Sequence, residues 1–218
     1  ENALAHGRPA SAASDAGIAT VADNRLFDRA REQERISRLL DEARAGRGGA
    51  IVICGEIGIG KTALLEAAAE QADGMRVLRV SGVEDVSERP YSGFEELCRP
   101  LLGGIGALPD TFRQALSATL GLAGANRGDR FAAFAGALWL LAAAAEEDPL
   151  LVCVDDAHLL DDASLEALAF IAGRIGAEAI ALLVATGGDP GRFGEAEIVE
   201  LQPLNRAASL TLLERSFD

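Results

Sequence analysis

A glycine-rich segment in the first third of the chain carries its only lysine. Lys61 stands among 20 lysine and arginine residues, and every other one is arginine. Residues 55–62 run Gly-Glu-Ile-Gly-Ile-Gly-Lys-Thr and match the pattern G-x-x-x-x-G-K-S/T in full. In this pattern the glycines let the backbone approach phosphate, and the lysine ammonium serves as a compact point charge. The segment therefore predicts a cradle for nucleotide phosphates.

The predicted cradle gives each residue of the segment a role. Backbone N–H groups of the loop and of the following helix would face the phosphates, because helix N-termini attract anions. Lys61 would reach the β- and γ-phosphates, and the Thr62 hydroxyl would ligate Mg²⁺. The predicted nucleotide contacts are Gly55, Glu56, Ile57, Gly58, Ile59, Gly60, Lys61, Thr62 and Ala63.

A second candidate is a pair of acids that follows the apolar run 150–154. Asp155 would hold the Mg²⁺ shell opposite Thr62, and Asp156 would orient or polarise the attacking water. The alternative is a strand end with two solvated acids. Asp156 and Lys61 are the predicted catalytic residues, and Thr62 and Asp155 the predicted Mg²⁺ ligands, with ATP or ADP as the bound nucleotide.

Two further polar residues lie near these acids. His158 follows them by two positions, and the chain has only two histidines, so we expect a structural or γ-phosphate-sensing role for His158 rather than a histidine metal site. Thr186 ends a predicted strand and could sense the γ-phosphate, or could simply begin a loop.

Aromatic residues offer a different hypothesis. Phe131, Phe134 and Trp139 fall within one alanine-rich helical segment and could stack nucleic-acid bases. We favour a core position for all three, because an acidic chain is poorly suited to nucleic acid.

Apolar runs and helical periodicity define the elements that must position these residues. Short apolar runs predict five strands, at 50–54, 75–80, 150–154, 180–185 and 198–201. Spacings of three and four predict helices at 26–44, 62–72, 91–102, 110–120, 130–147, 161–175 and 205–217, the sixth capped by Asp161 or Asp162. Alternating strands and helices predict an α/β fold with a mainly parallel sheet of about five strands.

The same pattern predicts the domain organisation. We expect a flexible N-terminal segment at 1–24, a P-loop NTPase core at 25–204 with a helical insertion at about 91–147, and the start of a truncated helical lid at 205–218. The chain begins with Glu1 rather than methionine, which favours an excised fragment.

The amino-acid composition limits which binding partners we expect. The net charge is −14 and the pI about 4.6, and DNA binding depends on neutralising phosphate, so we expect no direct DNA contact by this segment. No apolar run reaches 18 residues, which predicts no membrane span. Cys54, Cys98 and Cys153 lack metal-ligand spacing, and no secretory segment is present, which favours the cytoplasm.

Four blocks of sequence carry a resemblance to a known family: residues 55–65, residues 89–94 with 101–102, residues 154–164, and residues 168–174. Together they resemble the ATPase module of the large LuxR-type transcriptional activators (LAL family), in the STAND branch of AAA-like P-loop NTPases. The resemblance covers roughly residues 25–217 and implies a three-layer P-loop NTPase fold (ASCE/AAA-like). It implies a nucleotide-gated switch coupled to self-association, with DNA bound by a helix-turn-helix in a missing C-terminal part.

The sequence departs from that family at two positions. Of the family's Val-Gly-Arg-Glu box near the adenine only the arginine, Arg29, is kept, and it remains a predicted nucleotide contact. Near the end of the fourth strand the family usually has an arginine, and this chain has Thr186-Gly187-Gly188. With Asp156 where glutamate is commoner, these departures predict nucleotide binding with slow hydrolysis. The alternatives are a free-standing P-loop NTPase or kinase, and a degenerate ATPase fold used for oligomerisation.

Overall fold

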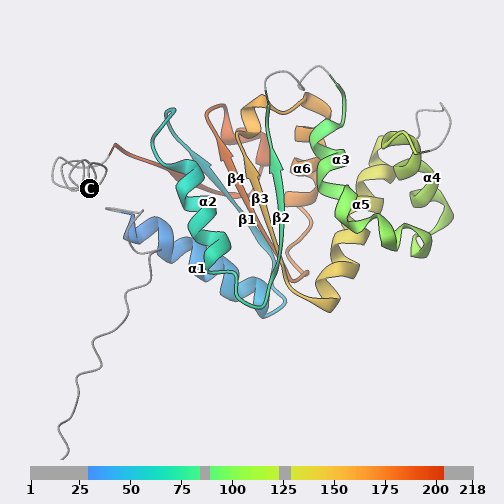
Figure 1. Ribbon diagram of the computed structural model, residues 1–218, viewed down its shortest axis with the longest axis horizontal. Helices are drawn as coiled ribbons and strands as arrows, with labels where there is room; N and C mark the ends of the chain where they lie inside the picture. Colours follow the sequence, from blue (N-terminus) through green and yellow to red (C-terminus); the bar gives the residue numbers. More distant parts are fainter. Residues whose placement is uncertain (1–28, 84–88, 123–128, 204–218) are drawn as a thin grey trace, which may run out of the picture.

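The computed structural model describes residues 29–83, 89–122 and 129–203 and contains a five-stranded sheet in the order β2-β3-β4-β1-β5 (Figure 1). All four strand pairings are parallel. The strands are β1 Gly49–Cys54, β2 Arg76–Ser81, β3 Leu150–Asp155, β4 Ile180–Thr186 and β5 Glu197–Glu200. The α/β fold class and the five strands predicted from sequence are confirmed.

Burial along the strands follows from their composition. In β4 every residue is buried, and in β3 all but the last, as expected for continuous apolar runs in a sheet covered on both faces. The edge strand β2 alternates exposed arginines with buried Leu78 and Val80. Central strands are therefore recognised by continuous hydrophobicity and the edge by alternation.

Helices cover both faces of the sheet, giving three layers (Figure 1). On one face α1 (Ala30–Arg44) and α2 (Lys61–Glu70) pack on β1, β3 and β4 through a cluster that includes Leu40, Leu64, Ile53, Leu151 and Leu183. On the other face lie α3 (Ser92–Cys98), α5 (Arg130–Glu147) and α6 (Asp162–Ala172), with α4 (Asp110–Thr119) packed beside α5. Successive strand residues point to opposite clusters, as the pleat requires.

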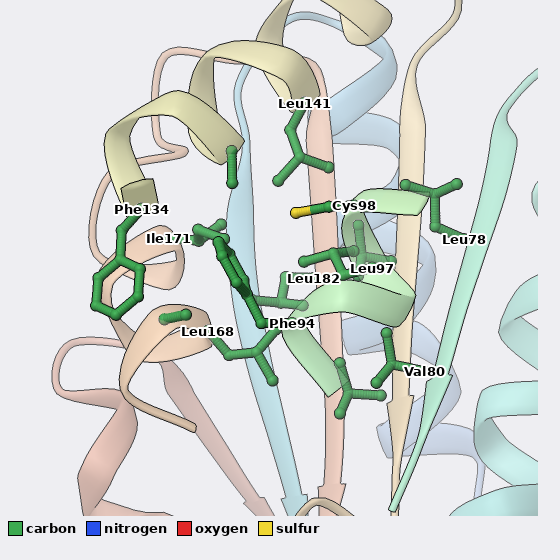
Figure 2. Close-up of a cluster of buried hydrophobic side chains, with 14 of the residues drawn as sticks. Leu78, Val80, Phe94, Leu97, Cys98, Phe134, Leu141, Leu168, Ile171 and Leu182 are labelled. Atoms are coloured by element: carbon green, nitrogen blue, oxygen red, sulfur yellow. The ribbon is translucent and has the colours of Figure 1, made fainter. Parts of the chain in front are cut away.

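The larger cluster has an aromatic centre. The rings of Phe94 and Phe134 are fully buried and meet edge-on, 5.6 Å between centroids. Figure 2 shows Phe94 with Phe134 on one side and Leu97 and Cys98 on the other, and with Leu182 close by, so residues from α3, α5 and β4 meet there.

The core position predicted for Phe131 and Trp139 is wrong, whereas that of Phe134 is confirmed. Phe131 is 51% exposed and Trp139 is 37% exposed. The buried positions of α5 recur every three to four residues from Ala133 to Ala145, and Phe131 and Trp139 fall outside that stripe. An alanine-rich helix has no strongly polar face to show which side meets the sheet.

Two helices also differ from their predicted bounds. The predicted helix 91–102 is split into α3 and a 3₁₀ helix, η3, at Arg99–Ala107. Pro100 lacks the N–H for an α-helical bond, and the glycines at 103, 104 and 106 favour the irregular continuation. The predicted helix 161–175 ends at Ala172, before Gly173, and its predicted cap is confirmed at Asp161.

The carboxyl ends of the parallel strands lie together at one edge of the sheet. Cys54 of β1 lies opposite Thr186 of β4, and Ser81 of β2 lies opposite Asp155 of β3. The residues that follow β1, β3 and β4 therefore lie close together, at the position where open α/β sheets bind ligands. Two short 3₁₀ helices, η4 (Ala157–Leu159) and η5 (Pro190–Phe193), follow β3 and β4 there.

Within the described ranges no helix is long and apolar enough to cross a membrane. The predicted flexible segment 1–24 and the predicted helix 205–217 lie outside the described residues.

Candidate nucleotide-binding site

The glycine-rich loop joins β1 directly to α2. Gly58 and Gly60 have φ angles of 78° and 103°, a left-handed region that side-chain-bearing residues rarely adopt. A Cβ built on either would have no atom within 4 Å. Glycine is therefore required by the backbone conformation, and the space beside the loop is open to a ligand.

Gly55 is constrained by packing as well as by conformation. Its φ is 152°, and an added Cβ would lie 3.1 Å from the Ile59 side chain and 3.3 Å from Leu201. The start of the loop thus lies close to Ile59 of the same loop and to Leu201, the residue after β5.

Lys61 is the first residue of α2 and is buried, with 6% exposed. Its ammonium donates to the carbonyls of Gly55 and Glu56, both at 2.9 Å. The charge is thereby placed within the curve of the loop. A phosphate there could accept from the same ammonium, which has three N–H groups.

The start of α2 supplies further donors. The first N–H groups of a helix have no partner within the helix. Here the Leu64 N–H is the first of α2 to donate to a carbonyl, that of Gly60. The N–H groups of Lys61, Thr62 and Ala63 precede it. Together with the helix dipole they make an anion site.

Arg29 supports this loop from outside. It is buried, donates to the Ile59 carbonyl at 3.1 Å and lies 3.5 Å from the Glu32 carboxylate. An arginine from the residue before α1 thus fixes the loop's main chain.

Asp155 and Asp156 leave β3 in a tight conformation. The Asp156 N–H donates to the Asp155 carboxylate at 2.9 Å. Asp156 has a φ of 44°. A positive φ is uncommon for residues that carry a side chain, and the residues that adopt it are often found at functional sites. The turn directs the chain into η4.

A pocket of about 490 Å³ lies between the loop and this turn. Its lining comprises Ile57, Gly58, Gly60, Lys61, Thr62, Ala63, Asp156, His158 and Leu159. Among the predicted residues of the described part of the chain, Gly55, Glu56, Ile59, Asp155 and Arg29 lie outside that lining. Ile57 is 92% exposed at the loop's tip.

Thr186 does not line this pocket. Its hydroxyl accepts from the Gly188 N–H at 3.0 Å, and it contributes to a neighbouring pocket of about 270 Å³. His158 lines both pockets, and its Nδ1 accepts from the Gly187 N–H at 3.2 Å. Sequence reasoning missed this contact, because β3 and β4 must first pair.

Asp161 anchors the segment that follows the pocket. Its carboxylate accepts from the N–H groups of Tyr91, Ser92 and Ser164 at 2.8–3.0 Å and from two serine hydroxyls. Burial raises the pKa of this carboxyl, but the hydrogen bonds from Ser164, Tyr91 and Ser92 outweigh it and hold the pKa below its ordinary value. The start of α3 is thereby tied to the start of α6.

The donor set fits Mg²⁺ carried by a nucleotide. Hydroxyl and carboxylate oxygens are the ligands Mg²⁺ prefers, usually with phosphate and water, and Thr62 and Asp155 supply one of each. Within the described residues no three His, Cys, Asp or Glu side chains form a group that could hold a metal by themselves.

A comparison with known families decides the class of the protein. The family model for the AAA ATPase domain matches residues 25–184. The chain belongs to the AAA ATPase domain family. No curated protein matches it.

Solved structures agree with this AAA fold. The Walker-type ATPase PABY2304 of Pyrococcus abyssi superposes with a TM-score of 0.54 at 17% identity, over 88% of this chain and 58% of that one. The Aeropyrum pernix ORC1 protein, solved in complex with DNA, gives 0.55 at 16% identity, over 91% and 51%. The AAA chain thus spans between half and three fifths of their lengths, and the likeness shows the fold.

A looser similarity is to a STAND protein with a tetratricopeptide-repeat sensor, PH0952 of Pyrococcus horikoshii. The TM-score is 0.47 at 22% identity, over 82% of this chain and 24% of that one. A superposition this loose does not separate one branch of the fold from another.

Proposed function

We propose that this AAA ATPase domain binds ATP with Mg²⁺ at the Lys61 pocket, hydrolyses it slowly, and acts as a nucleotide-dependent switch in a transcriptional activator. The observation that carries the proposal is the shared pocket itself. Lys61 and Thr62 on one side and Asp156 on the other come from separate elements and line the same space.

Binding is supported by the positive groups that converge on an otherwise acidic protein. The net charge is −14, yet the pocket has a buried ammonium, a helix N-terminus and a glycine loop with open space beside it. Gly55, Glu56, Ile57, Gly58, Ile59, Gly60 and Ala63 would form the phosphate-binding backbone. Arg29 would act by holding that backbone at Ile59.

Mg²⁺, when bound with nucleotide, would neutralise phosphate charge. Thr62 and Asp155 are the residues that would hold it. Asp155 already accepts the Asp156 N–H, which orients its carboxylate at the end of β3. Asp156 would then be the acid that holds or polarises the attacking water.

Slow hydrolysis is supported by the groups around Asp156. Its side chain is one methylene shorter than glutamate, and the strained φ of 44° restricts its backbone. At the end of β4, Thr186 is engaged by Gly188, and no arginine follows directly. Fewer groups would therefore stabilise the charge that develops on the transferred phosphoryl group.

A switch in a transcriptional activator is supported by the sequence resemblance at residues 55–65, 89–94 and 154–164. The structure connects the last two blocks, because Asp161 accepts from Tyr91 and Ser92. Nucleotide-dependent self-association belongs to the same proposal, as do a cytoplasmic location and the absence of DNA contact by this segment.

Steady-state phosphate release tests the rate. We expect turnover below roughly 1 per second, under the roughly 10 per second of a median enzyme. Asp156→Asn should abolish most of it while Mg-ATP binding persists, and Asp41→Asn, an exposed aspartate on α1, should change neither. Turnover of tens per second by the wild type would contradict the proposal.

Light scattering tests the switch. The molar mass of the wild type should rise on addition of Mg-ATP but not of Mg-ADP, and Lys61→Ala should not respond. A mass that is the same in both nucleotides would refute self-association as the output of the switch.

A further inference from the structure

We propose that His158 distinguishes ATP from ADP, by donating a hydrogen bond from Nε2 to the γ-phosphate while its Nδ1 holds the loop after β4. The inference rests on the proposed nucleotide binding and adds a residue to it. His158 would be a specificity-determining residue rather than the general acid or base.

The hydrogen bond to Gly187 identifies which ring nitrogen of His158 accepts. A backbone N–H can only donate, so Nδ1, at 3.2 Å from the Gly187 nitrogen, must accept. A neutral imidazole with an accepting Nδ1 carries its proton on Nε2. The opposite end of the ring is therefore a hydrogen-bond donor.

The ring also lies close to the loop after β4. A Cβ added at Gly187 would lie 3.4 Å from Nε2 and Cε1, and one added at Gly188 would lie 3.3 Å from the His158 Cβ. Two consecutive glycines thus let the loop lie flat against the imidazole.

His158 also has access to ligand. It is exposed and lines the pocket that Lys61, Thr62 and Asp156 share. Lys61 marks the phosphate end of that pocket. A donor in its wall would contact the last phosphate, which ATP has and ADP lacks.

The neighbouring Thr186 strengthens this assignment. Its hydroxyl accepts from Gly188, and it is buried in the adjacent pocket. Of Thr186 and His158, it is therefore His158 that contacts both the loop after β4 and the nucleotide pocket. Its Gly187 bond would carry the presence of a γ-phosphate to the β4–η5 loop.

Two substitutions separate the two ends of the ring. His158→Asn keeps an oxygen close to the place of Nδ1, so it can still accept from Gly187, but it has no donor at the far end. His158→Gln keeps a donor near the place of Nε2. The experiment is isothermal titration of each variant and the wild type with Mg-ADP and with Mg-ATPγS.

We expect His158→Asn to reduce the preference for Mg-ATPγS over Mg-ADP by roughly tenfold, as for loss of one hydrogen bond to a charged group. Its affinity for Mg-ADP should stay within about twofold, and His158→Gln should retain most of the preference. Because the preference is a ratio measured on one protein, it reports the contact even in a somewhat destabilised variant.

Two results would overturn the inference: an unchanged preference in His158→Asn, or an equal loss of affinity for both nucleotides. If either occurs while the wild type binds nucleotide through Lys61, the proposed function stands without this role for His158. A wild type that binds neither nucleotide would refute both.

Discussion

Replacing Asp161 should destabilise this domain far more than replacing its sequence neighbour Asp162. The Asp161 carboxylate is buried and accepts five hydrogen bonds, three of them from backbone N–H groups. Asp162 is 86% exposed and pairs with Arg192. The two residues are thus matched in type and position but differ in their surroundings.

The magnitude follows from the groups left unpaired. Loss of a helix N-cap costs about 1 kcal/mol, and Asp161→Ala removes the cap of α6. It also deprives the N–H groups of Tyr91 and Ser92 of a charged acceptor, at about 1–3 kcal/mol for each buried donor. Allowing for partial access to water, we expect a total loss near 3 kcal/mol. Asp162→Ala removes an exposed ion pair, worth less than about 1 kcal/mol.

Urea unfolding followed by circular dichroism measures both variants. For a domain of this size a loss of about 3 kcal/mol corresponds to a fall in Tm of about 6–12 °C. The slope of the unfolding free energy with urea should be similar in both variants. Equal losses from Asp161→Ala and Asp162→Ala would refute the idea that Asp161 ties the start of α3 to the start of α6.

Three further predictions follow from the structure. The pKa of the Asp161 carboxyl is lowered in the folded state, so its charge stabilises the fold above the ordinary carboxyl pKa, and this effect is lost as pH falls through the folded pKa. The difference in unfolding free energy between wild type and Asp161→Ala should therefore shrink below about pH 4. Burial raises the pKa of Cys98 to about 12 and that of Cys153 to about 11. Both thiols should therefore resist iodoacetamide at neutral pH in the folded protein and react with it in urea. Fast labelling of the folded protein would contradict their burial. Gly60→Ala should lower stability by about 1–2 kcal/mol and weaken Mg-ATP binding, because φ is 103° there. The control Gly103→Ala, at a position with open space and no positive φ, should do neither. Equal effects of the two substitutions on urea unfolding and on Mg-ATP titration would contradict this.

Much of the fold could be predicted because short apolar runs bounded by glycine or acid have few alternatives. The strands at Ile51, Val152 and Leu183 are of this kind, and all three are buried in the sheet. A cap at Asp161 or Asp162 could also be predicted, since an aspartate just before a helical run is a local signal, and the structure shows that the cap is Asp161.

Other features depend on contacts between distant segments. The bond between His158 and Gly187 joins residues 29 apart and exists only once β3 and β4 have paired. The exposed positions of Phe131 and Trp139 depend on how α5 rotates against the sheet, which its uniformly apolar composition does not specify. The carboxylate at Asp161 signals a cap in the sequence but not its bonds to Tyr91 and Ser92.

The central claim is that Lys61 holds nucleotide phosphate, and titration with Mg-ATP tests it most directly. The control is Arg38→Ala, which removes one positive charge from an exposed side chain of α1. The wild type and Arg38→Ala should bind with equal affinity, and Lys61→Ala should bind at least roughly tenfold more weakly while remaining folded. Equal affinity in all three proteins would contradict the account.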